Sequence, residues 1–401
     1  MKEVFSGNFT QQQPIPEEAI AAAVCVMRHG RLHRYNTAKD ELAETALLEQ
    51  EFAGFVGSAY CLAVASGGYA MATALRAIGV KPGDLVLSNA FTLAPVPGSI
   101  ASVGAVPVLV DVAPDLTIDL IDLERKITTS NAKVLLLSHM RGHICDMDKL
   151  MEICGRHEVQ VVEDCAHTMG ASWRGTNSGR HGVVGCYSTQ TYKHMNSGEG
   201  GFLVTDDPQV MARATILSGS YMLFELHLAG PSADAYNDIK YETPNISGRM
   251  DNLRAAILRP QLRDLSSQVA AWNERYRALE SGLRGVTGLT LIERSENENF
   301  VGSSFQFLLD EWNADAVQSV VNGCKDRGVE LKWFGAAEPV AFTSKYDSWR
   351  YAKPTALPNT DRIMAGLIDL RVPLTFSITD CDCIARIIRS EVENQFQQGV
   401  R

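Results

Sequence analysis

Residues 183–205 read V-V-G-C-Y-S-T-Q-T-Y-K-H-M-N-S-G-E-G-G-F-L-V-T, two short apolar runs joined by a polar, glycine-rich loop. The runs Val183–Tyr187 and Phe202–Thr205 are apolar almost throughout, a pattern typical of strands buried on both faces of a mainly parallel sheet. Lys193 lies in the loop between them, five residues after Ser188. A loop lysine is ordinarily solvated, but between two buried strands it would be partly desolvated, which favours the neutral, reactive form of its amine.

Further apolar runs of the same kind precede this segment. They lie at Leu85–Leu87, Val106–Val112, Val134–Leu137 and Val159–Glu163. Helix-like segments alternate with these runs, after two helices expected at residues 17–29 and 41–55. The alternation predicts an α/β fold in which helices cover both faces of the sheet.

The pattern changes after Gly248. Helices are expected at residues 251–263 and 269–283, with Pro260 kinking the first or marking a break. A sparser set follows, with strands at Leu289–Ile292, Phe305–Leu309 and Val329–Trp333 and helices at 314–327 and 380–397. Since 401 residues exceed what one hydrophobic core usually supports, we expect a large α/β/α domain over residues 15–265 and a smaller C-terminal α+β domain over residues 266–401.

Composition excludes several classes of protein. The formal net charge is -10 and no basic cluster stands out, which argues against a nucleic-acid partner. No apolar stretch is long enough to cross a bilayer, and the first residues lack the apolar core of a secretory signal, so a cytoplasmic protein without membrane contact is expected. Nine cysteines, an odd number without a C-x-x-C pair, fit reduced thiols better than disulfides.

No metal site is expected either. The C-D-C at Cys381 and Cys383 lies in a stretch that reads as helix. His139, His143 and His181 lack the spacing of a helical metal-binding motif, so hydrogen-bonding or substrate roles are the simpler interpretation.

Two further segments place polar groups at strand ends, where ligands gather in open α/β sheets. Ser66, Gly67 and Gly68 directly precede a helix-forming run, and bare amides at a helix N-terminus bind anions. Asp164 ends a buried strand, where a carboxylate is costly without a partner. Taken alone, the glycine pair is more typical of a tight turn, and Asp164 is equally typical of a helix cap.

Together these groups supply what pyridoxal 5'-phosphate requires. Lys193 would form a Schiff base with the aldehyde, Asp164 would hold the pyridine nitrogen protonated, and the amides of Gly67 and Gly68 with the Ser188 hydroxyl would cradle the phosphate. Phe91 follows another strand and would stack on the ring.

The same segments, in the same order, carry a family resemblance. A-S-G-G-Y-A-M, N-A-F-T-L-A, S-H-M-R-G-H-I-C-D-M-D, V-V-E-D-C-A-H-T-M-G-A, Y-S-T-Q-T-Y-K-H-M-N-S-G-E-G-G and G-R-M-D-N-L-R-A-A-I-L resemble the DegT/DnrJ/EryC1/StrS aminotransferases. These are fold-type I pyridoxal-phosphate enzymes that aminate keto-sugars. The resemblance extends from about residue 15 to the end and is weakest after residue 290.

The resemblance implies roles for particular residues. Lys193 would bind the cofactor covalently, Asp164 would contact its pyridine nitrogen, and His167 would lie near its hydroxyl. Ser188, Gly67 and Gly68 match phosphate-binding positions, and Phe91 matches the stacking aromatic. Family members in which histidine replaces the lysine are dehydratases, so Lys193 favours amino transfer.

Two departures from the family pattern affect the phosphate site. Gly68 stands where the family usually has threonine, which removes a hydroxyl. Ser247 stands where the family usually has an asparagine that reaches the phosphate of the partner subunit, and Asn245 lies two residues earlier. Either side chain is a candidate for that contact in a homodimer with active sites at the subunit interface.

The expected reaction is a ping-pong transamination through Schiff bases, from an amino acid donor, with glutamate expected, to a keto or aldehyde sugar or a similar carbonyl compound. An amino-acid racemase, epimerase or lyase would use the same lysine; a racemase would need a second base, with His139, His143 or Tyr192 as candidates. A non-catalytic regulator that binds the cofactor and a structural α/β protein are the remaining alternatives.

Overall fold

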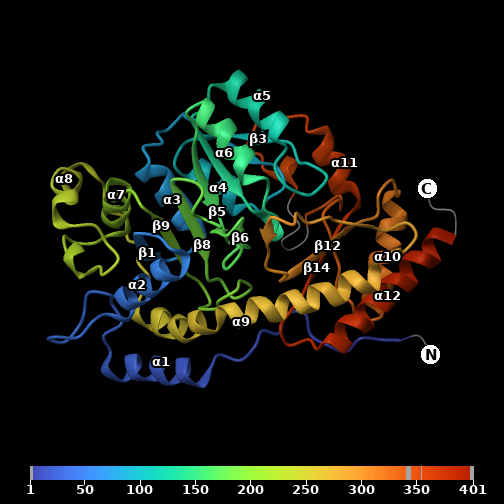
Figure 1. The fold of residues 1–401 in the computed structure, drawn as a ribbon, viewed down its shortest axis with the longest axis horizontal. Coiled ribbons are helices and arrows are strands. Elements are labelled where there is room, and N and C mark those ends of the chain that lie inside the picture. Colours follow the sequence, from blue (N-terminus) through green and yellow to red (C-terminus); the bar gives the residue numbers. More distant parts are fainter. Residues whose placement is uncertain (1–2, 340–344, 354, 398–401) are drawn as a thin grey trace.

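A seven-stranded sheet lies at the centre of the chain, whose computed structural model describes residues 3–339, 345–353 and 355–397 (Figure 1). Its strands, in spatial order, are β1 (Tyr60–Val64), β9 (Gly201–Thr205), β8 (Val184–Ser188), β5 (Gln160–Asp164), β4 (Val134–Ser138), β2 (Leu85–Asn89) and β3 (Val106–Val110). The pairs that β9 forms with β1 and β8 are antiparallel, and the other pairs in this sheet are parallel. The mainly parallel α/β fold predicted from the apolar runs is confirmed.

Helices cover both faces of this sheet, as the alternating pattern predicted. One face packs on α3 (Gly67–Ala77), α4 (Pro95–Ser102) and α7 (Pro208–Ser218). The other packs on α2 (Glu44–Val56), α5 (Leu120–Ser130), α6 (Met147–Arg156) and α9 (Asn252–Leu283). Because both faces of the sheet are buried, its strands do not alternate between apolar and polar residues.

The C-terminal part of the chain has a hydrophobic core of its own. Its antiparallel sheet has the order β10 (Thr290–Leu291), β12 (Ser304–Leu308), β14 (Leu367–Arg371) and β13 (Lys332–Trp333). The helices α10 (Ala314–Asp326), α11 (Pro358–Gly366) and α12 (Ile378–Gln397) belong to this part. Phe5 and Phe9 pack into the same core, so the N-terminal segment lies beside α12 (Figure 1).

The smaller elements connect these layers. Helix α1 (Glu17–His29) packs along α9. The other small elements are helix α8 (Ile239–Glu242) and a sheet of β11 (Glu298–Asn299), β6 (Ser172–Trp173) and β7 (Thr176–Asn177). Within the described ranges, no helix has the length and apolar character that a bilayer crossing requires.

The expected break at Pro260 is wrong. Residues 252–283 form one 32-residue helix, α9, with Pro260 inside it (Figure 1). Leu258, Leu262, Leu265 and Val269 are buried on either side of the proline, so the buried stripe continues at helical spacing. Packing along this stripe outweighs the loss of one backbone hydrogen bond at the proline.

Two of the five-residue strands escaped the sequence analysis. The segment Tyr60–Val64 (Y-C-L-A-V) reads equally well as helix because leucine and alanine favour helices, yet it forms edge strand β1. The segment Leu367–Arg371 (L-I-D-L-R) carries Asp369, which is fully buried in β14. A charged residue at the centre of a short apolar run hides the strand pattern from the sequence.

Candidate active site

A cavity of about 390 Å³ lies at the carboxyl ends of the parallel strands. Because β4, β5 and β8 run in the same direction, their last residues Ser138, Asp164 and Ser188 meet at one edge of the sheet. The cavity is lined by Ser66, Gly67, Gly68, Met71, Thr92, Leu93, Pro95, Val96, Ser138, Met140, Asp164, Ala166, His167, Ser188, Gln190, Lys193 and Glu199. Six predicted residues, Gly67, Gly68, Asp164, His167, Ser188 and Lys193, are therefore brought together here.

Asp164 is held at this edge by two hydrogen bonds, one of which is supported by a third. The backbone N–H of Ala166 donates to Oδ1 at 3.1 Å, and the Ser138 hydroxyl donates to Oδ2 at 2.9 Å. The Thr92 hydroxyl in turn donates to Ser138 Oγ at 2.8 Å. A carboxylate has about four acceptor sites, so Asp164 retains capacity for a further N–H donor.

Lys193 extends from the loop after β8 into the same cavity. Its Nζ lies 2.8 Å from His167 Nε2. Burial lowers the pKa of Lys193 to about 8; Asp164 opposes this shift, while Arg141 and Arg371 add to it. Burial likewise keeps the pKa of His167 well below its usual value, so its imidazole is neutral and accepts the lysine hydrogen bond at Nε2.

The start of α3 forms the other wall of the cavity. Ser66 caps this helix by accepting a hydrogen bond from the Tyr69 N–H at 3.1 Å. A Cβ on Gly67 would lie 2.9 Å from Ser188 Cβ, so a glycine is required where the helix meets the end of β8. At Gly68 a Cβ would meet nothing closer than 3.9 Å. Free amides at this helix start, with the Ser188 hydroxyl, suit an anion.

These residues fit pyridoxal phosphate. An amine of lowered pKa, a carboxylate with acceptor capacity and an anion-binding helix start line one cavity, and they match the aldehyde, ring nitrogen and phosphate of that molecule.

Phe91 is placed differently from the prediction. Its side chain is 1% exposed and packs edge-on against Phe334, with ring centroids 5.2 Å apart, in a separate core cluster. It does not line the cavity, whereas Thr92 and Leu93 do. The backbone after β2 thus turns Phe91 toward the C-terminal part, and its position gives no support to the predicted stacking on a cofactor ring.

Ser247 and Asn245 also lie outside this cavity. Both are exposed, and Arg249 donates a hydrogen bond to Ser247 Oγ at 3.2 Å. Their predicted contact was with the phosphate of a partner subunit, so it stays a prediction.

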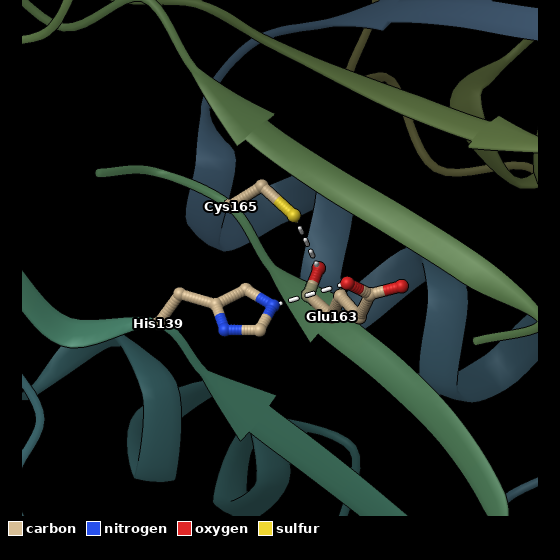
Figure 2. Close-up of side chains that lie close together, drawn as sticks. All are labelled: His139, Glu163 and Cys165. Carbon is tan, nitrogen blue, oxygen red and sulfur yellow. Dashed lines mark hydrogen bonds and ion pairs between the residues drawn. The ribbon is translucent and has the colours of Figure 1, made fainter. Parts of the chain in front are cut away.

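A metal-like cluster of His139, Glu163 and Cys165 lies beside the site (Figure 2). His139 Nε2 lies 3.0 Å from Glu163 Oε2, and the backbone N–H groups of residues 179, 181 and 182 also donate to this carboxylate. Burial holds the pKa of Cys165 well above its usual value, so the thiol stays protonated. Hydrogen bonding accounts for the cluster, which fixes the strand residue next to Asp164.

Several site residues escaped the sequence analysis. Ser138 ends a predicted strand, so the strand-end rule that selected Asp164 would also have selected it. Arg141 adopts φ 57, is buried and pairs with Asp369 at 3.0 Å. Arg371 ends β14, a strand whose pattern was hidden, so no sequence signal marked it.

Comparison with known proteins identifies the family. The DegT/DnrJ/EryC1/StrS aminotransferase family matches residues 15–389. A Streptoalloteichus tenebrarius protein that carries the name L-glutamine:3-amino-2,3-dideoxy-scyllo-inosose aminotransferase is 30% identical over 309 residues, which cover 75% of this chain and 72% of that protein. A Streptomyces venezuelae dTDP-3-amino-3,4,6-trideoxy-alpha-D-glucose transaminase is 34% identical over 249 residues, 61% of each chain.

A solved structure shows the same fold. The crystal structure of S. venezuelae DesV in complex with a ketimine intermediate is 26% identical, has a TM-score of 0.78 and covers 94% of both chains. The resemblance drawn from the sequence motifs is confirmed.

Proposed function

The chain belongs to the DegT/DnrJ/EryC1/StrS aminotransferase family, and from this we propose that the cavity at the ends of β4, β5 and β8 is its transamination site. The protein is a pyridoxal-phosphate-dependent aminotransferase that acts on keto-sugars. The observation that carries the assignment is that the Lys193 amine and the Asp164 carboxylate line one cavity with the start of α3.

When bound, pyridoxal phosphate supplies a carbonyl that takes up the amino group and a ring that accepts electrons from the neighbouring carbon. Lys193 would hold the cofactor through its aldehyde, and its neutral amine would carry a proton during the reaction. Asp164 would accept a hydrogen bond from the ring nitrogen and so keep that nitrogen protonated. His167 would orient the lysine amine, and the amides at Gly67 and Gly68 with the Ser188 hydroxyl would hold the phosphate.

The positions of other predicted bases favour transamination over racemisation. His139 is hydrogen-bonded to Glu163, and His143 Nε2 lies 2.9 Å from Gln306 Oε1. Neither histidine lines the cavity. Tyr192 lies beneath the Arg371 guanidinium, 3.8 Å from its ring centroid, where a cation covers its face.

The acceptor is proposed to be a keto-sugar or keto-cyclitol, and the donor to be glutamate. One of the two relatives is named for an inosose and the other for a dTDP-linked sugar. These names support both free and nucleotide-linked acceptors. We also keep the proposed division into domains 15–265 and 266–401, although α9 runs across residue 265. A cytoplasmic homodimer with shared sites completes the proposal.

Lys193→Ala tests the assignment. The variant should lose the visible absorbance of the bound cofactor and all measurable turnover, since no other amine replaces it in the cavity. Lys149→Ala, at a lysine side chain that is 70% exposed, is the matched control and should keep both. A yellow, active Lys193→Ala protein would refute the assignment.

The acceptor is then identified with the aminated form of the cofactor bound to the wild-type protein. Keto-sugars, free and nucleotide-linked, are mixed with it one at a time. Return of the original absorbance marks an acceptor, and a complete lack of response across the sugar panel would contradict the proposed acceptor class.

A further inference from the structure

The carboxylate of Glu163 lies on the face of the central sheet that is turned away from the cofactor cavity. Successive residues of a strand point to opposite faces, so the Glu163 side chain lies on the side where Val161 and Cys165 pack against α2 and α9. Asp164, the next residue, lines the cavity. Glu163 is 0% exposed, and a carboxylate buried so deeply is costly unless hydrogen bonds or charges hold it. The proposed transamination does not use this group, so its burial requires another explanation.

Four hydrogen bonds hold the Glu163 carboxylate. The backbone N–H of Gly179 donates to Oε2 at 2.9 Å, and those of His181 and Gly182 donate to Oε1 at 2.8 Å and 2.7 Å. His139 Nε2 lies 3.0 Å from Oε2 (Figure 2). Burial opposes ionisation, yet these bonds hold the pKa of Glu163 below its usual value. The ionised group only accepts hydrogen bonds, so His139 Nε2 is a donor.

The loop of residues 178–182, which donates three of these bonds, also holds Tyr187, the residue before Ser188. The Tyr187 hydroxyl donates a hydrogen bond to the carbonyl oxygen of Ser178. A Cβ on Gly179 would collide with this hydroxyl, so the loop packs directly on the tyrosine. The loop therefore holds both β5 and β8 from the far face, in each strand one residue before a side chain that lines the cofactor cavity.

His139 joins the end of β4 to the same arrangement. Its backbone N–H donates to the carbonyl oxygen of Asp164 at 3.1 Å, while its ring donates to Glu163. Ser138, the residue before it, donates to the Asp164 carboxylate on the cavity face. Two consecutive residues of one strand end thus hold two consecutive residues of the next, on both faces of the sheet and through the backbone.

We propose that Glu163 is a positioning residue of the cofactor site, which acts by holding His139 and the loop 178–182 against the far face of the sheet. It thereby fixes the spacing of Asp164 and Ser188, which would bind the ring nitrogen and the phosphate at opposite ends of one molecule. A rigid ring held at both ends requires this spacing to be kept closely. The inference rests on the proposed function, because it assumes that both side chains bind the same cofactor.

Glu163→Gln tests the role of the carboxylate through the dissociation constant of pyridoxal phosphate, measured by fluorescence titration of the full chain freed of cofactor. Glutamine replaces one accepting oxygen by an N–H donor that faces another donor, so the loop 178–182 must withdraw. We expect the dissociation constant to rise about tenfold. The pH profile of the bound cofactor's absorbance should also change, because Asp164 loses its alignment with the ring nitrogen.

Two substitutions of His139 test the hydrogen bond itself, and they remain informative if Glu163→Gln does not fold. His139→Leu removes the donor and should raise the dissociation constant of the cofactor about fivefold. His139→Gln places an amide donor where Nε2 stands and should restore binding to within about twofold of the wild-type value. If His139→Gln bound the cofactor as weakly as His139→Leu, the hydrogen bond to Glu163 would not be responsible and the proposal would be overturned.

Asp111→Asn is the matched control for a purely structural effect. Asp111 follows β3, is 5% exposed and does not line the cofactor cavity. Its carboxylate accepts hydrogen bonds from the Thr360 N–H at 2.7 Å, the Thr360 hydroxyl at 2.6 Å and the Asn359 N–H at 3.2 Å. This variant should lose several degrees of thermal stability, as Glu163→Gln should, but keep the dissociation constant of the cofactor within about twofold.

The comparison of these two variants decides the proposal. Equal cofactor binding by Glu163→Gln and Asp111→Asn would show that the Glu163 carboxylate only stabilises the fold, which overturns its positioning role. Failure of the proposed function gives a different result, since the wild-type protein would then not bind pyridoxal phosphate at all.

Discussion

The Ser138 hydroxyl donates a hydrogen bond to Asp164 Oδ2 across 2.9 Å, and both residues are the last of their strands. The bond comes from the register of β4 and β5, which sets these two residues side by side. Thr92 completes the series by donating to the Ser138 hydroxyl. The orientation of the Asp164 carboxylate, which we propose faces the cofactor nitrogen, is therefore fixed by neighbouring strand ends.

Ser138→Ala should weaken this control of Asp164. Without this donor the carboxylate is free to turn out of line with the ring nitrogen, so the pH profile of the bound cofactor's absorbance should change. We expect turnover to fall about fivefold, for the loss of roughly 1 kcal/mol. A titration of the visible spectrum and a steady-state assay measure the two effects.

Ser88→Ala is the control for this substitution. Ser88 is fully buried in β2, and its hydroxyl has no hydrogen-bond partner in the described part of the chain. The two variants remove the same atom from the same sheet, but only one of them touches Asp164. An identical pH profile for Ser138→Ala and Ser88→Ala would show that the Ser138 bond has no role in the chemistry.

The strand ends explain how far the sequence alone reaches. Asp164, Ser188 and Lys193 could be expected near one another because buried parallel strands have a clear apolar pattern and ligand groups follow such strands, and the three residues line one cavity. Phe91 lies outside the cavity, which the sequence does not indicate because the direction of a side chain after a strand depends on the turn that follows. Leu93 lines the cavity instead of Phe91, and no periodicity in N-A-F-T-L-A indicates this difference.

Contacts between distant segments were beyond the sequence. Arg141 reaches Asp369 across more than two hundred residues, and the pair joins the loop after β4 to the sheet of the C-terminal part. Arg371 adjoins Tyr192 in the same way. Such pairs depend on how two cores pack against each other. Pro260 illustrates the opposite error, since a strong local signal was overridden by a continuous buried stripe.

The lowered pKa of Lys193 predicts how cofactor attachment depends on pH. In protein freed of cofactor, the amine is mostly protonated below about pH 8 and mostly neutral above it. Since only the neutral amine attacks an aldehyde, the rate of attachment should rise with pH and level off above about pH 8. Stopped-flow absorbance after mixing with pyridoxal phosphate measures this rate across the pH range.

The sign of each neighbour's effect can be checked in the same assay. Asp164 raises the pKa of Lys193 by stabilising its charged form, so Asp164→Asn should move the midpoint to lower pH. Arg371 lowers that pKa, so Arg371→Gln should move the midpoint to higher pH. Shifts in the reverse directions would contradict the electrostatic account of the site.

Gly68 offers a substitution that should improve cofactor binding. A Cβ at this position has its nearest neighbour at 3.9 Å, and the helix start bears no positive φ there, so a side chain fits without strain. Gly68→Ser would add a hydroxyl beside the amides of the phosphate site and restore the kind of group that the family carries. We expect the dissociation constant of the cofactor to fall about fivefold, measured by fluorescence titration.

Gly67→Ser is the contrasting variant. A Cβ there would lie 2.9 Å from Ser188 Cβ, so the helix start and β8 would have to separate. Cofactor binding should weaken and thermal stability should drop by several degrees, an effect of roughly 1–3 kcal/mol. If both glycine variants bound the cofactor equally well, the close contact between Gly67 and Ser188 would not govern the site.

The proposed sharing of sites between subunits has a test that uses two inactive proteins. Asn245 and Ser247 are exposed and outside the cavity of their own chain, as expected if they reach the phosphate of a partner. A protein with Asn245→Ala and Ser247→Ala should bind cofactor poorly, and Lys193→Ala should be inactive.

The two variant proteins are mixed, unfolded together and refolded, so that hybrid dimers form. Each hybrid dimer contains one site with intact Lys193 and intact Asn245 and Ser247. Activity should therefore return to about a quarter of the wild-type value, because half of the dimers are hybrids with one working site each. If the two side chains acted within their own chain, every site in the hybrid would carry a lesion and no activity would return.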